Sequence, residues 1–124
     1  MDNNNNFEVK ALLEVIIKGM QEKKAEKITI IDLRGLENSV CDYFVITNAN
    51  SNTQVNAIAD SIQKETLETL GDKAWHKEGT ESSEWILMDY VNIVAHIFQT
   101  SVREFYALED LWADAEITEI KASN

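Results

Sequence analysis

Residues 41–60, "CDYFVITNANSNTQVNAIAD", predict a strand, a polar loop and a helix in direct succession. The continuous apolar run at 43–47 predicts a strand that is buried on both faces. The helix is expected to start at Ser51 or Asn52, which are residue types that cap helices. Proteins that bind nucleotides often hold a phosphate at such a helix N-terminus. The stretch therefore leaves two alternatives, a nucleotide site or a helix cap in a scaffold with another function.

The composition of the loop favours the helix cap. A backbone that approaches a phosphate closely usually needs glycine, and residues 47–53 contain neither glycine nor lysine. Asparagine tolerates the left-handed backbone conformation and also caps helices. The sequence therefore predicts a tight turn followed by a capped helix.

The segments on both sides of this stretch predict further helices and strands. Apolar residues at helical spacing from Val9 to Met20 predict a first helix, with Asn5 as its cap and Glu8 as the capping-box partner. Gly71 is the expected C-terminal cap of the second helix. A last helix is expected to start at Ser101, where the S-x-x-E capping box falls, and to carry an apolar stripe made of Val102, Phe105, Leu108 and Trp112. Strands are expected at 27–33, 43–47, 73–76, 84–90 and 93–98.

This order of elements predicts an α/β (α+β) fold with a single mixed sheet of about five strands and helices packed on it. Residues 7–113 are expected to form one domain. Residues 1–6 are expected to be a flexible N-terminus. Residues 114–124 form an acidic tail that is either a short edge strand or disordered.

The charge of the chain restricts its partners. Its 124 residues include 22 acidic and 11 basic side chains, which gives a net charge of −11. Neither DNA nor a membrane is an expected partner, because binding to phosphates requires a basic face. A basic protein would instead be attracted. The single cysteine, Cys41, and the lack of a signal peptide predict a cytoplasmic protein.

No pattern for metal or nucleophilic catalysis stands out. Cys41, His76 and His96 lack the spacing of a zinc site, and Cys41 is expected to be a small, buried side chain. Asp32 and Asp89 lie at strand ends, as does Asp42, and such carboxylates can bind magnesium. We expect these acids to accept hydrogen bonds from loop amides, with no metal and no cofactor.

The strand expected at 84–90 has apolar side chains on both faces. Trp85 and Leu87 point to one side together with Asp89, whereas Met88 and Tyr90 point to the other. The pattern does not decide which face is exposed. Glu78, Glu81 and Glu84 in the preceding loop would place an acidic rim beside an exposed aromatic patch, which is an arrangement suited to a basic protein.

Five motifs in order resemble the ribosomal silencing factor family, also called Iojap-like proteins. They span nearly the whole chain: "DYFVI" at 42–46, "IAD" at 58–60, Gly79 followed by "WILMDY" at 85–90, "VAHIF" at 94–98 and "REFYALEDLW" at 103–112. The resemblance implies a core like that of a nucleotidyltransferase without the catalytic acids. It also implies a protein that is not an enzyme.

The resemblance further implies a partner and a mechanism. The partner would be large-subunit ribosomal protein fourteen. Binding to it would block association of the two ribosomal subunits and so repress translation when nutrients are scarce. A homodimer of the free protein is also compatible with the resemblance. The partner-binding residues that the resemblance implies are Trp85, Met88, Tyr90, His96 and Phe98, with the acids Glu81, Glu84 and Asp89.

Two departures from the family pattern bear on these expectations. Val91 and Asn92 stand where the family usually has Gly-Asp. Because valine resists positive φ, a type I′ turn would cost about 1–2 kcal/mol here, and another turn type or offset strands are expected. The loop at 49–52 lacks the family's glycine, which weakens the nucleotide alternative. That alternative would be a Mg-dependent nucleotidyltransferase-like enzyme using Asp42 and Asp89.

Overall fold

The computed structural model describes the backbone of residues 2–37 and 39–121, and side chains from residue 7 onward within those ranges. The elements in chain order are α1 (Asp2–Glu22), β1 (Glu26–Asp32), β2 (Tyr43–Ala49), α2 (Asn52–Leu70), β3 (His76–Glu78), β4 (Trp85–Asp89), β5 (Ile93–Gln99), α3 (Thr100–Tyr106), α4 (Leu108–Leu111) and β6 (Glu116–Glu119).

The strands form one mixed sheet, as predicted, in the order β3-β4-β5-β2-β1-β6. β2 and β5 are parallel neighbours at the centre, and the other pairs are antiparallel. The sheet has six strands and not about five, because residues 116–119 of the acidic tail pair with β1. All residues of β2 are buried, which confirms the prediction for this strand.

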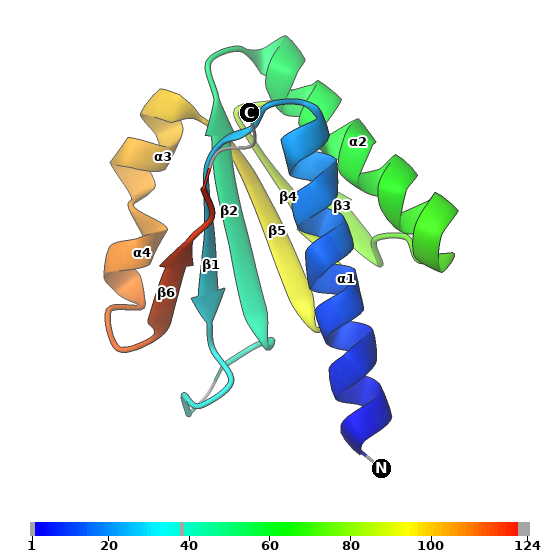
Figure 1. The fold of residues 1–124 in the computed structure, drawn as a ribbon. Helices are drawn as coiled ribbons and strands as arrows, with labels where there is room; N and C mark the ends of the chain where they lie inside the picture. Colours follow the sequence, from blue (N-terminus) through cyan, green and yellow to red (C-terminus); the bar gives the residue numbers. More distant parts are fainter. Residues whose placement is uncertain (1, 38, 122–124) are drawn as a thin grey trace.

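Helices cover both faces of the sheet (Figure 1). α1 and α2 lie together on one face, and their apolar sides cover Val45, Ile86 and Met88. α3 and α4 lie over the other face, where Trp112 packs on a second core that includes Phe44 and Phe98. The sheet thus separates a large core from a smaller one, and the smaller core has the thinner cover.

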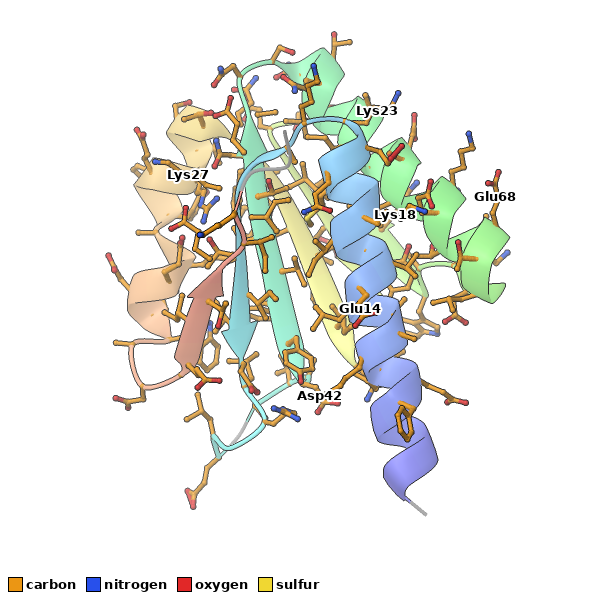
Figure 2. The ribbon with its side chains drawn as sticks, viewed as in Figure 1. Glu14, Lys18, Lys23, Lys27, Asp42 and Glu68 are labelled. Carbon is orange, nitrogen blue, oxygen red and sulfur yellow. The ribbon has the colours of Figure 1, made fainter. Side chains whose placement is uncertain are left out.

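The contact between α1 and α2 depends on Gly19. A Cβ atom at Gly19 would lie 2.7 Å from the Cα of Ile62, and the Ser61 hydroxyl donates a hydrogen bond to the Gly19 carbonyl at 2.7 Å. Outside this contact, charged side chains project from the helices into solvent (Figure 2). Among them, Lys18 and Glu65 form an ion pair at 3.7 Å across the two helices.

Local signals gave the ends of α2 correctly. Ser51 Oγ accepts a hydrogen bond from the Gln54 N–H at 3.1 Å, and Gly71 ends the helix with φ of 70°. The favoured interpretation of the asparagine loop, a helix cap, is therefore confirmed. The predicted cap of the first helix is wrong, because α1 begins at Asp2, before Asn5.

The last helix departs most from its prediction. It begins at Thr100 after Gln99, so Ser101 is not its cap, and it ends at Tyr106. Ala107 has φ of 46° and separates α3 from the short α4. The strand expected at 73–76 also begins later, at His76.

Candidate interaction surface

Trp85 is the centre of an aromatic group on the sheet face opposite α1 and α2. It pairs with Phe98 across β4 and β5, and the two ring centroids are 4.8 Å apart. The indole N–H donates a hydrogen bond to Nδ1 of His96 at 3.0 Å. Because Trp85 is held by a strand, a ring contact and a hydrogen bond, its partly exposed face is ordered before any partner arrives.

His96 lies beneath Trp85 and is buried, with 4% exposure. Burial lowers the pKa of His96 to about 4, so the imidazole is neutral at physiological pH. Since Nδ1 accepts the indole hydrogen bond, the proton lies on Nε2, and this nitrogen has no partner among the described residues. The histidine expected at the edge of an apolar patch therefore has a hydrogen-bond partner for only one of its two ring nitrogens among the described residues.

Two residues of α3 extend the exposed area. Tyr106 packs on Trp85 with centroids 4.8 Å apart, and Phe105 contacts Tyr106 edge to face at 5.1 Å. Phe105 is 80% exposed and Tyr106 is 47% exposed. We name Trp85, Leu87, Phe105 and Tyr106 the aromatic surface. Of the apolar stripe expected in the last helix, Val102, Leu108 and Trp112 pack against the second core, whereas Phe105 points into solvent.

The structure divides the predicted partner-binding residues between two faces of the sheet. Met88 and Tyr90 lie under α1 and α2 with 0% and 7% exposure, and the Tyr90 hydroxyl hydrogen-bonds that of Thr66 at 2.9 Å. Phe98 is on the same face as Trp85 but fully buried beneath it. Met88, Tyr90 and Phe98 are therefore buried in the free protein: alternation along β4 turns Met88 and Tyr90 to the face opposite Trp85, and Phe98 lies beneath Trp85.

The predicted acids differ in their freedom to bind a partner. Glu81 and Glu84 are exposed in the loop before β4. Glu104, which precedes Phe105 in α3, is also exposed, but it lines a pocket with Lys27, Arg103 and Glu119. Asp89 is partly buried, and its Oδ1 accepts a hydrogen bond from the Val91 N–H at 2.7 Å, so it serves the turn between β4 and β5.

The loop before Trp85 is fixed by Gly79. This residue has φ of 86°, and a Cβ atom would lie 2.0 Å from the Trp85 carbonyl oxygen. The Ser83 N–H donates to the Gly79 carbonyl at 2.9 Å, and Asn56 on α2 donates to the Ser83 hydroxyl at 2.9 Å. The sequence motif that starts with Gly79 therefore has a physical role, which is to let the chain pass close to the backbone of Trp85.

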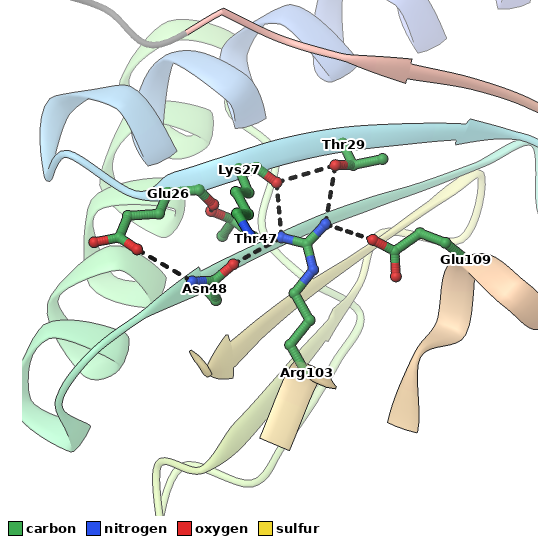
Figure 3. A network of polar contacts seen from close by, with 7 residues as sticks. All are labelled: Glu26, Lys27, Thr29, Thr47, Asn48, Arg103 and Glu109. Atoms are coloured by element: carbon green, nitrogen blue, oxygen red, sulfur yellow. Dashed lines mark hydrogen bonds and ion pairs between the residues drawn. The ribbon is translucent and has the colours of Figure 1, made fainter. Parts of the chain in front are cut away.

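Arg103 holds α3 and α4 against the sheet (Figure 3). Its guanidinium is buried and donates to the Lys27 carbonyl at 2.7 Å, to Asn48 Oδ1 at 2.8 Å and to the Thr29 hydroxyl at 2.9 Å. It also pairs with Glu109 at 2.6 Å, across the break between the two helices. The bulge in β1 between Glu26 and Thr29 exposes the Lys27 carbonyl for this contact.

The turn at Val91 and Asn92 has an unusual backbone. Val91 has φ of 76°, and the Asn92 N–H donates to the Tyr90 carbonyl at 3.0 Å. These features match a γ-turn with positive φ, which is rare and strained. The expectation of a turn other than type I′ is confirmed, because Asn92 is not among the residues with positive φ, although Val91 does adopt the conformation it was expected to resist.

The strand-end acids have the structural partners that the sequence predicted. Asp32 Oδ1 accepts from the Arg34 N–H at 3.0 Å, and the Arg34 side-chain hydrogen bond lowers the pKa of Asp32. Asp42 Oδ2 accepts from the Asn92 amide at 3.3 Å. Within residues 2–37 and 39–121, no three or more His, Cys, Asp or Glu side chains are grouped to hold a metal ion.

Cys41 is partly buried, and burial raises the pKa of its thiol to about 11. Its Sγ donates to the Tyr43 carbonyl at 3.3 Å. The thiol is thus protonated at neutral pH, which is unfavourable for a nucleophile. No described helix is both long and apolar enough to cross a lipid bilayer.

An open mixed sheet with helices on both faces and an ordered, exposed aromatic surface beside acids defines a small α/β protein suited to binding another protein. A sequence profile described as "Ribosomal silencing factor during starvation" matches residues 6–124. The chain belongs to the ribosomal silencing factor family, whose members are ribosome-associated silencing proteins. This confirms the resemblance inferred from the motifs.

Individual relatives agree with this assignment. The chain is 35% identical over 111 residues to ribosomal silencing factor RsfS of Bacillus subtilis, covering 90% of this chain and 92% of the relative. A solved structure from Chromobacterium violaceum has a TM-score of 0.78 at 28% identity, covering 93% of this chain and 95% of that one. Similarity also extends to a mouse protein named "Mitochondrial assembly of ribosomal large subunit protein 1", at 26% identity over 89% of this chain and 50% of the relative.

Proposed function

We propose that this protein binds large-subunit ribosomal protein fourteen through the aromatic surface, and that the bound protein sterically blocks association of the ribosomal subunits. The observation that carries the proposal is the exposed aromatic group around Trp85, with the exposed Glu84 directly before Trp85 in the chain. Membership of the silencing family supports a ribosomal partner. The name of the mouse relative supports a partner on the large subunit.

The mechanism requires occupancy and no bond chemistry. Large aromatic side chains dominate the binding energy of protein interfaces, and Trp85 is held in place by Phe98 and His96, so little ordering is needed on binding. The net charge of −11 attracts a basic ribosomal protein and accelerates the encounter. Once bound, the body of the protein would occupy the volume that the small subunit needs. Repression of translation when nutrients are scarce follows from this blockade.

Co-sedimentation with purified large subunits tests the proposal. Trp85→Ala should weaken binding by about 2 kcal/mol, or roughly 30-fold in Kd. Phe105→Ala is a cleaner variant because the side chain is 80% exposed and contributes little to the core, and it should weaken binding by about 1–2 kcal/mol. Leu67→Ala, which removes an exposed apolar side chain from α2, is the matched control and should bind like the wild type.

The blockade is measured by light scattering after small subunits are added to saturated complexes. The wild type should slow subunit joining, and the Trp85→Ala and Phe105→Ala variants should lose this effect in proportion to their loss of binding. Unchanged co-sedimentation of both variants would contradict the aromatic surface as the site. Normal subunit joining at full occupancy would contradict the steric mechanism.

The same aromatic surface supports a second candidate, a homodimer of the free protein. Phe105 and Tyr106 expose apolar area that a second copy could cover. Sedimentation velocity at several concentrations tests this, with Phe105→Ala expected to shift the protein toward the monomer. An unchanged distribution of species would contradict the dimer.

The alternative of a Mg-dependent nucleotidyltransferase has a simple test. Asp42 and Asp89 both accept hydrogen bonds from the turn that contains Val91 and Asn92, which gives them a structural use. A ligand that binds only the native state raises the melting temperature. Mg-ATP should therefore leave the melting temperature unchanged, whereas the ribosomal protein should raise it.

A further inference from the structure

A groove of about 840 Å³ lies at the opposite end of β4 from Trp85. Its walls are the N-terminal half of α1, the segment that follows α2 and the turn between β4 and β5. Figure 2 shows Asp42 at this end of the sheet, beside α1. Trp85 and Asp89 lie at the two ends of β4, about 13 Å apart along the strand. The groove is therefore a separate surface from the aromatic surface.

Trp75 forms an apolar wall of the groove and is 77% exposed. Its backbone N–H donates to the Asp89 carbonyl at 2.7 Å, which fixes the base of the side chain. Val91 lies on the opposing turn and is 60% exposed. Leu12 and Tyr90 are buried and close the floor. Trp75 and Val91 thus leave two large apolar side chains in water at one groove, and tryptophan is enriched among the residues that dominate binding energy.

The charges around the groove select the kind of partner. Glu8, Asp42 and Asp72 contribute three carboxylates, against one ammonium group from Lys73. This excess of negative charge repels phosphates, and it repels a second copy of a chain whose net charge is −11. A cation is attracted instead, and the indole of Trp75 offers a π face for it. Arginine fits best, because its planar guanidinium stacks on an aromatic ring and also binds carboxylates with two N–H groups.

We propose that this groove is a second docking site, which takes an arginine flanked by aliphatic residues in an extended segment of a partner protein. The guanidinium stacks on Trp75 and faces Asp72 and Glu8, while the aliphatic neighbours contact Val91 and Leu12. The site is independent of the aromatic surface, so the protein can hold two partners, or two parts of one partner, at the same time.

Peptide titration monitored by ¹H–¹⁵N NMR tests the proposal. The probe is acetyl-Gly-Leu-Arg-Leu-Gly-amide, and the comparison peptide carries glutamine in place of arginine. The chain has three tryptophan indole signals, which Trp→Phe variants assign individually. The Trp75 indole signal should shift in a saturable manner with the arginine peptide, while the Trp85 signal stays in place.

Matched variants make the charge argument falsifiable. Asp72→Asn should weaken the arginine peptide about threefold to fivefold. Trp75→Ala should abolish the saturable shift of the Val91 backbone amide signal, which reports on the same groove in the absence of the Trp75 indole. Glu68→Gln makes the same change of net charge on an exposed position of α2 outside the groove and should bind like the wild type. Both groove residues are exposed, so their variants should keep the wild-type spectrum elsewhere.

Several results would overturn the proposal. An unshifted Trp75 signal would remove the site, and equal binding of the glutamine peptide would remove the role of arginine. Equal weakening by Glu68→Gln would reduce the effect to general charge attraction. Shifts of the Trp75 signal on dilution without peptide would identify a second copy as the occupant. Large-subunit binding is measured separately with Trp85→Ala, so the two proposals can fail independently.

Discussion

Replacing Gly79 by alanine tests whether the loop before Trp85 is positioned as the structure has it. At Gly79, positive φ coincides with a close contact, since a Cβ atom would lie 2.0 Å from the Trp85 carbonyl oxygen. Gly71 has φ of 70° but open space around it, and Gly19 has a close contact at 2.7 Å without positive φ. Gly35 has neither feature. Alanine at each of these four positions therefore separates backbone strain from steric contact.

The expected free-energy changes follow from these two costs. Alanine at Gly71 costs about 1–2 kcal/mol because its backbone must stay left-handed, and the less flexible unfolded chain offsets part of this cost. The net loss of folding stability should be about 1 kcal/mol. Alanine at Gly19 overpacks the helix contact by about 1–3 kcal/mol but gains about 1 kcal/mol of helix propensity. Alanine at Gly79 combines strain and overpacking and should cost about 2–4 kcal/mol. Alanine at Gly35 should be neutral or slightly stabilising.

Urea unfolding followed by circular dichroism measures these differences. The transition midpoint should fall in the order Gly35, Gly71, Gly79 while the m-value stays constant. Large-subunit binding is then measured without urea, at a temperature where all variants are folded. Gly79→Ala should weaken binding and Gly71→Ala should not, because only Gly79→Ala displaces Trp85. Equal midpoints for Gly79→Ala and Gly71→Ala would show that the Trp85 carbonyl is not where the structure places it.

Three other changes have defined outcomes. As the pH falls from 6.5 to about 4, the free energy of unfolding should drop by about 3 kcal/mol, because the unfolded chain takes up a proton at His96 that the folded chain excludes. Comparing the pH dependence of denaturation between the wild type and His96→Gln isolates this loss. Arg103→Met should cost about 3–5 kcal/mol in urea unfolding because it leaves the buried acceptors without a donor, and wild-type stability would refute the network. Val91→Asn should stabilise the fold by about 1 kcal/mol and raise the melting temperature by several degrees, because asparagine tolerates positive φ. An unchanged or lower melting temperature would mean that Val91 is not strained.

The features that the sequence predicted correctly are those that local chemistry determines. Ser51 caps α2 because its hydroxyl reaches an N–H three residues away, and Gly71 ends the helix because it tolerates positive φ. The seven residues of β2 are all buried, as the apolar run from Tyr43 to Ile46 at the start of this central strand indicates. Each of these features depends on neighbours along the chain, so the pattern contains the whole cause.

The end of the chain was harder to predict because its partners are distant in sequence. The guanidinium of Arg103 binds Lys27 and Asn48, which lie in β1 and β2, and it also pairs with Glu109 beyond the break at Ala107. A continuous helix would have matched the apolar spacing from Val102 onward. The pair between Arg103 and Glu109 crosses the break in the helix, and no periodicity in this segment signals it or the acceptors in β1 and β2.

The candidate site shows the same division between local and distant causes. Alternation along β4 separated Trp85 from Met88 and Tyr90 correctly, but it gave no measure of how well each face is covered. Coverage depends on the lengths of the helices. α1 and α2 bury Met88 completely, whereas the seven residues of α3 leave Phe105 and Tyr106 in solvent. Adjacent aromatic residues in a short helix were the one available signal, because one helix face cannot bury both.

The Val91 turn shows why a correct energetic argument gave an incomplete structural prediction. Positive φ does cost a β-branched residue about 1–2 kcal/mol. The turn nevertheless adopts it, because Asp89 accepts from the Val91 N–H at 2.7 Å and the Tyr90 N–H donates to the Ile93 carbonyl at 2.8 Å. A hydrogen bond contributes about 1 kcal/mol, or more when one partner is charged, so two of them outweigh the strain. Asp89 is thus explained by the turn that it stabilises, which leaves no need to assign it to catalysis.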